Sequence, residues 1–389
     1  MPVKKGYSGA SGAYAAVDEF AERVHQPNIG FVLFFASPVY PRDQLAAALT
    51  ARYPGVSVFG CTTAGEITPD GYREHTIAGA SFSKDEFAAT LTLIPNLDSF
   101  KIDDGSMVVA GALERHREHG LEHGTLPAST FGMLLIDGLS RQEETVIVSL
   151  CRFLDSMSLF GGSAGDGLDF GSTWVYCDGA FHTNAAVLAL VQTSCPFKVF
   201  RFDHFVPTDR KMVVTEADPS RRLVTEINAE PAALEYARMV GLPEQQLSPM
   251  IFAAYPVVVR VGGEYHVRAI QKVEEDGSLR FYCAIDEGLV LTVAGSQDIS
   301  AHLDHALTNV QKDLGDLQVI LGFDCILRRL EVEQKQKTRE VSSILSKHGV
   351  IGFSTYGEQF RSMHVNQTFT GVAIGRAVPQ LPADRVSDT

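Results

Sequence analysis

Three glycine-rich segments, each ending in an acidic residue, are the part of this sequence best suited to bind a small molecule. They read FGCTTAGE at 59–66, FGGSAGD at 160–166 and IGFSTYGE at 351–358. Free N–H groups of a glycine-rich turn can bind a carboxylate. The terminal acids Glu66, Asp166 and Glu358 could then bind an ammonium group or hold Arg side chains and backbone donors. Alternatively, the glycines only permit close packing and the acids only cap helices or backbone amides.

The third segment carries the largest number of directed polar groups. Tyr356 and Arg361 lie close to Glu358 in the sequence, and His364 follows on a predicted strand face whose other side chains are Asn and Thr. Such a face suits a small polar ligand. The residues that we expect to line a ligand pocket are Glu66, Asp166, Tyr356, Glu358, Arg361 and His364.

The same segments give less support for catalysis. Ser163, Thr62 and Ser354 could act as nucleophiles, but none lies in a GxSxG motif and no histidine is placed beside it as a base. No Lys-Ser or Lys-Thr pair follows these glycines, so they do not form a P-loop. We expect a protein that is not an enzyme, with an enzyme using the Gly-acid loops as the less favoured alternative.

Each glycine-rich segment ends a similar stretch of sequence. Apolar runs of strand length begin at Phe31, Phe131 and Gln318, and a helical pattern follows each of them. The acid comes 35 residues after Phe31, 35 after Phe131 and 40 after Gln318. A repeated strand–helix–strand unit predicts a mixed α/β (α+β) fold with partly parallel pairing. Loops at strand ends are also where such folds bind ligands.

A chain of 389 residues exceeds one ordinary core, so we expect two domains. A lead-in at 1–24 precedes an N-terminal domain at 25–225, a C-terminal domain at 226–378 and a tail at 379–389. Other expected elements are a helix at 41–52, strands at 76–83, 87–94 and 197–206, a hairpin turn at Asp178-Gly179 and one long helix at about 327–347.

Composition excludes several classes of partner. The net charge of −14 argues against a broad nucleic-acid surface and against an anionic membrane surface. Six cysteines without a CxxC pair are typical of reduced thiols and not of a disulfide framework or zinc site. No apolar run reaches 18 residues and the N-terminus lacks a signal-peptide core, so we expect a soluble cytoplasmic protein.

These segments resemble one protein family in order and in spacing. FGCTTAGEI at 59–67, with the strand GASFS after it, resembles the N-terminal half of FIST-domain proteins. LGFDCILRR at 321–329 and GFSTYGEQFRSMHVNQTFTGVAIG at 352–375 resemble the C-terminal half, and EINAEPAALEY at 226–236 resembles the segment that joins them. The resemblance covers residues from about 25 to 376.

The resemblance implies a bacterial cytoplasmic sensory protein that binds a small ligand and works with a signalling partner, with amino acids as one ligand class. A subgroup, the NosP proteins, is implied to bind haem, sense nitric oxide and regulate a histidine kinase on a separate chain. We expect a stand-alone unit without a kinase, cyclase or receiver-like module, which is the arrangement implied for that subgroup, so we favour it. A homodimer is compatible with either version.

Haem requires an axial iron ligand in an apolar slot, and His204 is the best candidate. On a strand at 197–206 the period of two places Phe200, Phe202 and His204 on one face with Val206. Nitric oxide binding would then weaken the His204–iron bond. The alternative for His204 is a core histidine bonded to the backbone. The other candidate iron ligands are His364, His75 and Cys195.

Overall fold

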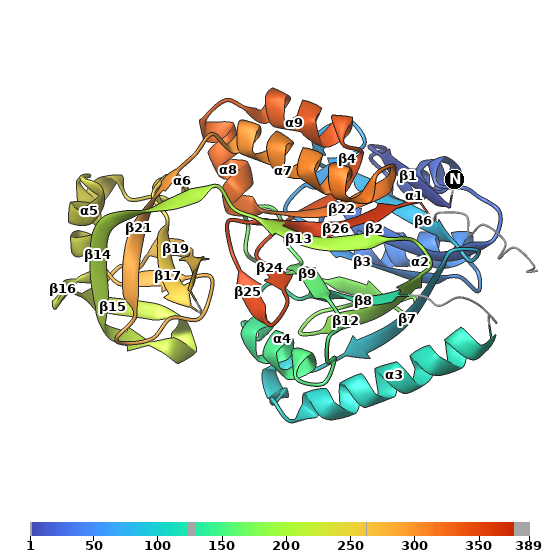
Figure 1. The fold of residues 1–389 in the computed structure, drawn as a ribbon, viewed down its shortest axis with the longest axis horizontal. Helices are drawn as coiled ribbons and strands as arrows, with labels where there is room; N and C mark the ends of the chain where they lie inside the picture. The colour runs from blue at the N-terminus through green and yellow to red at the C-terminus, as the bar shows by residue number, and fades with distance from the viewer. Residues whose placement is uncertain (1, 123–128, 262, 377–389) are drawn as a thin grey trace, which may run out of the picture.

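The computed structural model describes residues 2–122, 129–261 and 263–376, so the predicted tail at 379–389 lies outside the described residues. Three similar units follow one another along the chain, and a further group of strands is inserted before the third unit (Figure 1). Each unit contains a helix, a strand, one or two helices, a second strand, a short hairpin and a return strand.

The first unit comprises α1 Ala13–Arg23, β2 Ile29–Ala36, α2 Arg42–Arg52, β3 Ser57–Thr62, β4 Glu66–Thr68, β5 Gly71–Arg73 and β6 Ile77–Ser83, preceded by β1 Val3–Ser8 and followed by β7 Phe87–Ile94. The second comprises α3 Asp104–Glu122, β8 Ser129–Ile136, α4 Glu143–Cys151, β9 Leu159–Ser163, β10 Val175–Cys177, β11 Ala180–His182 and β12 Ala186–Thr193, followed by β13 Phe197–Phe202. The third comprises α7 Ile299–Leu314, β22 Leu317–Cys325, α8 Ile326–Gln334, α9 Thr338–Lys347, β23 Val350–Thr355, β24 Glu358–Phe360, β25 Met363–Val365 and β26 Phe369–Gly375.

The first strand of every unit pairs in parallel with the second strand and antiparallel with the return strand. The last parallel partners are Ala36 with Thr62, Ile136 with Ser163, and Cys325 with Thr355. These equivalent registers place the three glycine-rich segments at the same position of each sheet. The predicted mixed α/β fold with repeated strand–helix–strand units is confirmed.

Each hairpin pairs with the sheet of another unit. Hairpin β10–β11 pairs with β3, hairpin β24–β25 pairs with β9, and hairpin β4–β5 pairs with β23. On the opposite side β1, β7 and β13 complete the sheets, so the described part of the three units forms three six-stranded sheets with one shared strand order. The exchange closes a ring and covers strand edges that would otherwise be exposed.

The inner faces of the three sheets share one apolar core. Phe35 of the first unit stacks on Phe353 of the third at 4.7 Å between ring centroids, and Phe323 contacts Phe35, Phe353 and Phe160. Helices cover each outer face: α1 and α2 on the first sheet, α3 and α4 on the second, and α7 and α9 on the third (Figure 1).

Residues 205–296 form a separate lobe, here called the inserted lobe, at the left of Figure 1. Every pairing between its described strands is antiparallel, and Tyr236 and Phe252 pack in an apolar core of its own. Its elements are β14 Phe205–Asp218, β15 Leu223–Ile227, β16 Glu230–Pro231, α5 Ala232–Val240, α6 Pro249–Ala254, β17 Val257–Val261, β18 Glu264–Arg268, β19 Ile270–Val273, β20 Leu279–Phe281 and β21 Val290–Ser296.

Strand pairing does not divide the chain at the boundary between the predicted N-terminal and C-terminal domains. The inserted lobe contains residues on both sides of position 225, and β13 pairs with β26 near the other end of the chain. The ranges 25–225 and 226–378 therefore describe sequence halves and stay a prediction as domains. Among helices of residues 2–122, 129–261 and 263–376, none has the length and apolar composition needed to cross a bilayer.

The predictions for individual elements succeed in part. The helix at 41–52 and the turn at Asp178-Gly179 are confirmed, and both turn residues have positive φ. The single helix at 327–347 is wrong, because Gln336 has φ 55° and separates α8 from α9. The strand at 197–206 is also wrong, since β13 ends at Phe202 where the chain leaves for the inserted lobe. Strands 76–83 and 87–94 exist but lie in different sheets.

Phe353→Ala should lower the free energy of unfolding by about 3–5 kcal/mol, because its ring is fully buried between two units. Urea unfolding followed by circular dichroism measures the change. Val148→Ala, on the outer side of α4 and 39% exposed, is the control and should cost less than about 1 kcal/mol. Equal losses for the two variants would contradict a core shared by all three sheets.

Candidate functional site

The three glycine-rich segments meet at the centre of the ring. Backbone N–H groups donate from one segment to another in a closed set: Gly165 to Thr62 (3.0 Å), Ala64 to Ser354 (2.9 Å), Ser354 to Gly65 (2.7 Å), Ser163 to Gly357 (2.8 Å) and Tyr356 to Ser163 (3.3 Å). The three segments therefore form one cluster, here called the loop cluster.

The repeated glycines are required by close approach. A Cβ at Gly60, Gly161 or Gly352, the second residue of each segment, would lie 1.7–2.2 Å from a carbonyl oxygen of the neighbouring strand. A Cβ at Gly165 would lie 2.8 Å from the Ala64 nitrogen. These distances support the interpretation in which the glycines permit close packing.

Two of the three acids bind threonine groups of their own unit. Glu66 accepts from the Thr76 amide (3.1 Å) and hydroxyl (2.7 Å), and Glu358 accepts from the Thr368 amide (3.3 Å) and hydroxyl (2.6 Å). Each threonine follows its acid by ten residues, so each acid ties together the two ends of an exchanged hairpin. Both carboxyls are fully buried. Burial raises the pKa of Glu66 to about 7 and raises the pKa of Glu358 well above its usual range.

Asp166 is used differently. Its carboxylate accepts from the backbone N–H groups of Phe170 (3.0 Å), Gly171 (2.7 Å) and Ser172 (2.7 Å), and also from the Tyr356 hydroxyl. The Tyr356 ring stacks on Phe170 with 4.8 Å between centroids. Asp166 and Tyr356, two of the predicted pocket residues, are therefore joined, and they fix the loop at 167–172.

A cavity of about 910 Å³ lies between the loop cluster and the inserted lobe. Tyr356 and Phe170 form part of its wall on one side, and Phe281 and Tyr282 of the inserted lobe form part of the other. Its volume is within the range of small-molecule sites, which often lie between domains. The cationic residues that line it are Arg141, Arg221, Arg222, Lys272 and Arg280.

Three of these five cations have acidic partners. Arg222 pairs with Glu143 (2.8 Å) and Glu144 (2.5 Å), which connects the inserted lobe to α4. Lys272 and Arg280 share Glu274. The guanidinium groups of Arg141 and Arg221, both exposed residues, form no hydrogen bond or ion pair with any described residue. The cavity is thus suited to an anionic group.

The other predicted pocket residues lie apart from this cavity. Arg361 is exposed at the turn between β24 and β25, where it lies over the Phe360 ring, so it does not point at Glu358. His364 is buried, with Nδ1 3.3 Å from the Gln359 amide nitrogen. His75 is exposed beside a smaller cavity of about 310 Å³, which Asp166 also lines. Arg141, Arg221 and Tyr282 were not predicted, although the Arg221-Arg222 doublet is a signal that could have found two of the cavity cations.

His204 does not lie on the predicted strand face, since β13 ends two residues before it. It is buried, while Val206 is 47% exposed. Its Nδ1 accepts from Arg328 (2.8 Å) and its Nε2 lies 2.9 Å from a Glu331 carboxylate oxygen. Because arginine can only donate, the ring proton lies on Nε2 and the imidazole is neutral. Burial also lowers the pKa of His204.

Two of the four candidate iron ligands, His204 and Cys195, are already bonded to other side chains. Both ring nitrogens of His204 are already bonded, and the Cys195 thiol donates to Glu86 (2.8 Å), where burial raises its pKa to about 11. Of the described residues that line the cavity of about 910 Å³, none is a histidine or a cysteine. Nor do the described residues contain a group of three or more His, Cys, Asp or Glu side chains that could hold a metal ion.

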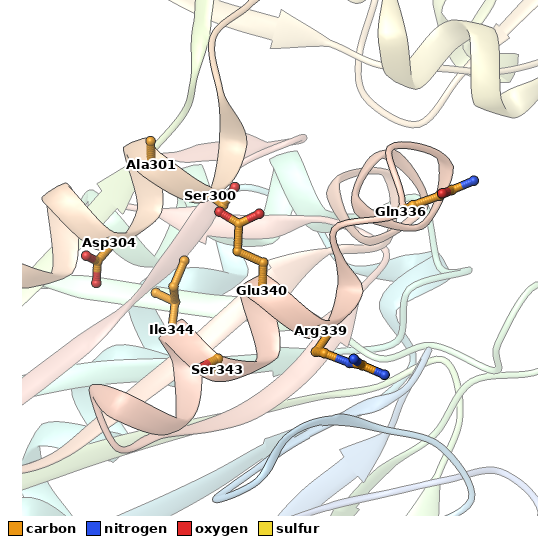
Figure 2. Close-up of a pocket in the computed structure, with 8 residues that line it drawn as sticks. All are labelled: Ser300, Ala301, Asp304, Gln336, Arg339, Glu340, Ser343 and Ile344. Carbon is orange, nitrogen blue, oxygen red and sulfur yellow. The ribbon is translucent and has the colours of Figure 1, made fainter.

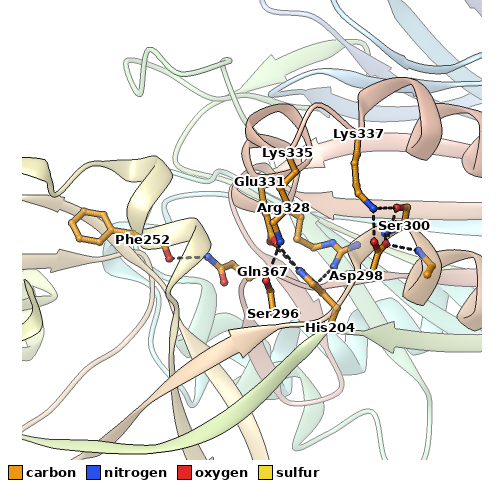
Figure 3. A network of polar contacts seen from close by, with 11 residues as sticks. His204, Phe252, Ser296, Asp298, Ser300, Arg328, Glu331, Lys335, Lys337 and Gln367 are labelled. Carbon is orange, nitrogen blue, oxygen red and sulfur yellow. Dashed lines mark hydrogen bonds and ion pairs between the residues drawn. The ribbon is translucent and has the colours of Figure 1, made fainter. Parts of the chain in front are cut away.

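The network around His204 joins both linkers of the inserted lobe to α8 (Figure 3). Glu331 binds His204 of the first linker and also Lys335, which donates to Ser296 at the end of β21 (2.9 Å). Lys337 binds Asp298 of the second linker (2.5 Å). Glu331, Lys335 and Lys337 therefore hold the two linkers through which the chain enters and leaves the lobe.

A further surface pocket of about 560 Å³ lies between α7 and α9. Its acids already have partners, since Asp304 binds Lys347 and His348 and Glu340 pairs with Lys337. Figure 2 shows the Arg339 side chain pointing away from the others. This pocket offers fewer directed groups than the cavity beside the loop cluster.

Comparison with protein families decides the identity of the chain. Residues 30–230 match the FIST N domain and residues 232–361 match the FIST C domain. The chain belongs to the FIST family. FIST domains are sensory domains for small ligands, which agrees with a cavity between two lobes. Comparison with curated proteins gives no match.

Glu66→Gln should weaken the pH dependence of stability between about pH 5 and pH 7. A carboxyl whose folded pKa is raised to about 7 stabilises the fold while protonated, so stability falls as pH rises through this window. The wild-type protein should lose up to about 3 kcal/mol more than the variant across it. Urea unfolding at several pH values measures this, with Glu118→Gln, an exposed carboxyl on α3, as control. Identical pH profiles for wild type and Glu66→Gln would disprove the assignment.

Proposed function

We propose that this FIST protein senses a small polar metabolite, an amino acid or another carboxylate, in the cavity between the loop cluster and the inserted lobe. The observation that carries the proposal is a cavity of about 910 Å³ with aromatic walls and two guanidinium groups that form no ion pair with a described residue. The fold of the loop cluster supports it, because Tyr356 and the Asp166-bound loop form a rigid wall.

Binding would restrain the inserted lobe. The loop cluster and the inserted lobe each form part of the cavity wall. A ligand that contacts both therefore favours one arrangement of the lobe over others. Helix α8 supports a route for the signal, because Leu330 lines the cavity and its neighbour Glu331 binds His204 in the linker. A ligand that contacts Leu330 thus acts on the helix that holds both linkers. The partner that we expect to read this change is a histidine kinase on a separate chain.

The second candidate is the version with haem, in which a cytoplasmic bacterial protein of the NosP type senses nitric oxide. The volume of the cavity and its cations would suit a porphyrin with two carboxylates. We place it second because His204 is fully bonded and the cavity wall contains no histidine or cysteine among its described residues. An enzyme that uses the Gly-acid loops stays the third candidate, since Glu66 and Glu358 are both buried and bonded.

A thermal-shift screen with amino acids and small carboxylates tests the first proposal. A ligand at about 100 times its Kd should stabilise the protein by about 2.7 kcal/mol. Leu168→Trp should abolish this gain, because Leu168 is 56% exposed and lines the cavity, so the larger ring can occupy it without repacking a core. Val148→Trp, on α4 outside the cavity wall, is the matched control and should keep the gain. A ligand that stabilises both variants equally would place the site elsewhere.

Absorption spectra after haemin addition distinguish the metabolite sensor from the haem-based nitric oxide sensor. We expect no stoichiometric Soret band that depends on His204. The variant His204→Ala should instead lower the free energy of unfolding by about 1–3 kcal/mol, because Glu331 and Arg328 each lose a buried partner. A Soret band that shifts with nitric oxide and disappears in His204→Ala would establish the haem sensor and overturn our preference.

A further inference from the structure

We infer that the ligand of the large cavity is a planar aromatic anion whose ring stacks on the Phe170–Tyr356 wall and whose carboxylate or phosphate binds Arg141 and Arg221. This inference rests on the proposed function, and it replaces the broad class of polar metabolites by one chemistry. It also disfavours a zwitterionic amino acid as the ligand.

The ring subsite is held in place by contacts within the chain itself. Phe170 stacks on Tyr356, and its ring centroid lies 6.1 Å from that of Tyr282 on the inserted lobe. Asp166 holds Phe170 through its backbone and Tyr356 through its hydroxyl, whose oxygen also accepts from the Asp166 backbone N–H (3.2 Å). A wall of aromatic rings fixed at both ends binds a flat ring with little loss of side-chain freedom.

The backbone at Phe170 supports a function for this ring. Phe170 has φ 51°, a left-handed conformation that a bulky side chain rarely adopts, and three hydrogen bonds to Asp166 maintain it and the next two residues. Such strain is concentrated at ligand sites, where the surrounding structure holds a side chain in place. Here the conformation directs the ring to the cavity wall that it shares with Tyr356.

The charges of the cavity select an anion. Arg222, Lys272 and Arg280 are paired with Glu143, Glu144 and Glu274. The Arg141 and Arg221 guanidinium groups form no ion pair with a described residue, although the Arg221 charge also acts on the exposed carboxylates of Asp218 and Asp276. Arg141 follows β8 of the core and Arg221 precedes β15 of the inserted lobe. One anionic group bound by both arginines would therefore bridge the core and the inserted lobe.

The same charges disfavour a free ammonium group. Of the acids, Glu143 alone lines the described wall of the cavity, and it already binds Arg222 at 2.8 Å. An ammonium group placed there would compete with a buried guanidinium and face two further cations. Aryl carboxylates and nucleoside monophosphates share the favoured chemistry, and the volume of about 910 Å³ accommodates either.

Isothermal titration of the full chain with 2-naphthoate and with adenosine monophosphate tests the inference. Adenosine supplies a ring without the anion, and citrate supplies an anion without the ring. We expect 2-naphthoate or adenosine monophosphate to bind at least about tenfold more tightly than adenosine and citrate. Tighter binding of 2-naphthoate would identify the anionic group as a carboxylate, and tighter binding of adenosine monophosphate would identify it as a phosphate. Neither binding more tightly than adenosine and citrate would overturn the inference.

Three variants resolve the two subsites. Arg141→Ala and Arg221→Ala should each weaken binding of the preferred probe by about 10–100-fold, since each removes a charge-assisted hydrogen bond. Phe170→Leu should weaken it by about 2–10-fold, because the side chain stays apolar but the stacked ring is lost. Arg117→Ala, an exposed arginine on α3, is the control and should bind as the wild type does. Full affinity in both arginine variants would also overturn the inference.

The outcomes also separate this inference from the proposed function. If the aromatic anions fail while an amino acid or aliphatic carboxylate stabilises the wild type and not Leu168→Trp, the aromatic class is wrong and the sensor remains. If none of the probes or screened metabolites shows an effect that depends on Leu168, both the inference and the proposed function fail.

Discussion

Each of the three sheets is completed by a hairpin that belongs to another unit, and this exchange sets the position of everything at the centre of the molecule. After the second strand of each unit, the chain pairs through its hairpin with the edge of another unit's sheet. Small residues are required where two segments meet, because a Cβ at Gly165 would lie 2.8 Å from the Ala64 nitrogen of the first unit. The buried acids Glu66 and Glu358 then fasten the hairpins where they leave.

The site follows from this ring but is not inside it. The contribution of the loop cluster to the cavity of about 910 Å³ is a wall made by Tyr356 and the loop that Asp166 holds. The inserted lobe supplies the opposite wall and most of the positive charge. This lobe is attached through two short linkers, the first held by a buried contact of α8 and the second by exposed contacts of Lys335 and Lys337 between α8 and α9. Its position therefore depends on a few polar contacts.

Periodic features of the chain could be predicted from sequence, whereas pairings over long distances could not. Repeated strands and helices, the Asp178-Gly179 turn and the importance of the glycine-rich segments all follow from local patterns. The partner of Glu66–Thr68 is β23, more than 280 residues later, and no local pattern indicates this. His204 was misplaced because an alternating apolar pattern continues across a point where the chain changes sheet. The cavity was missed because its arginines are brought to Tyr356 by tertiary folding alone.

The order of the units along the chain has a consequence for synthesis of the protein. Hairpin β4–β5 is complete once Arg73 has been made, but its partner strand begins at Val350. At about 5–20 residues per second the hairpin must wait on the order of tens of seconds for a strand to pair with. The inserted lobe lengthens this delay, since it lies between the second and third units. The first sheet has all its strands once His182 has been made, but the second sheet keeps an unpaired β9 edge until β24 is made. The ring therefore closes only when nearly the whole chain has left the ribosome.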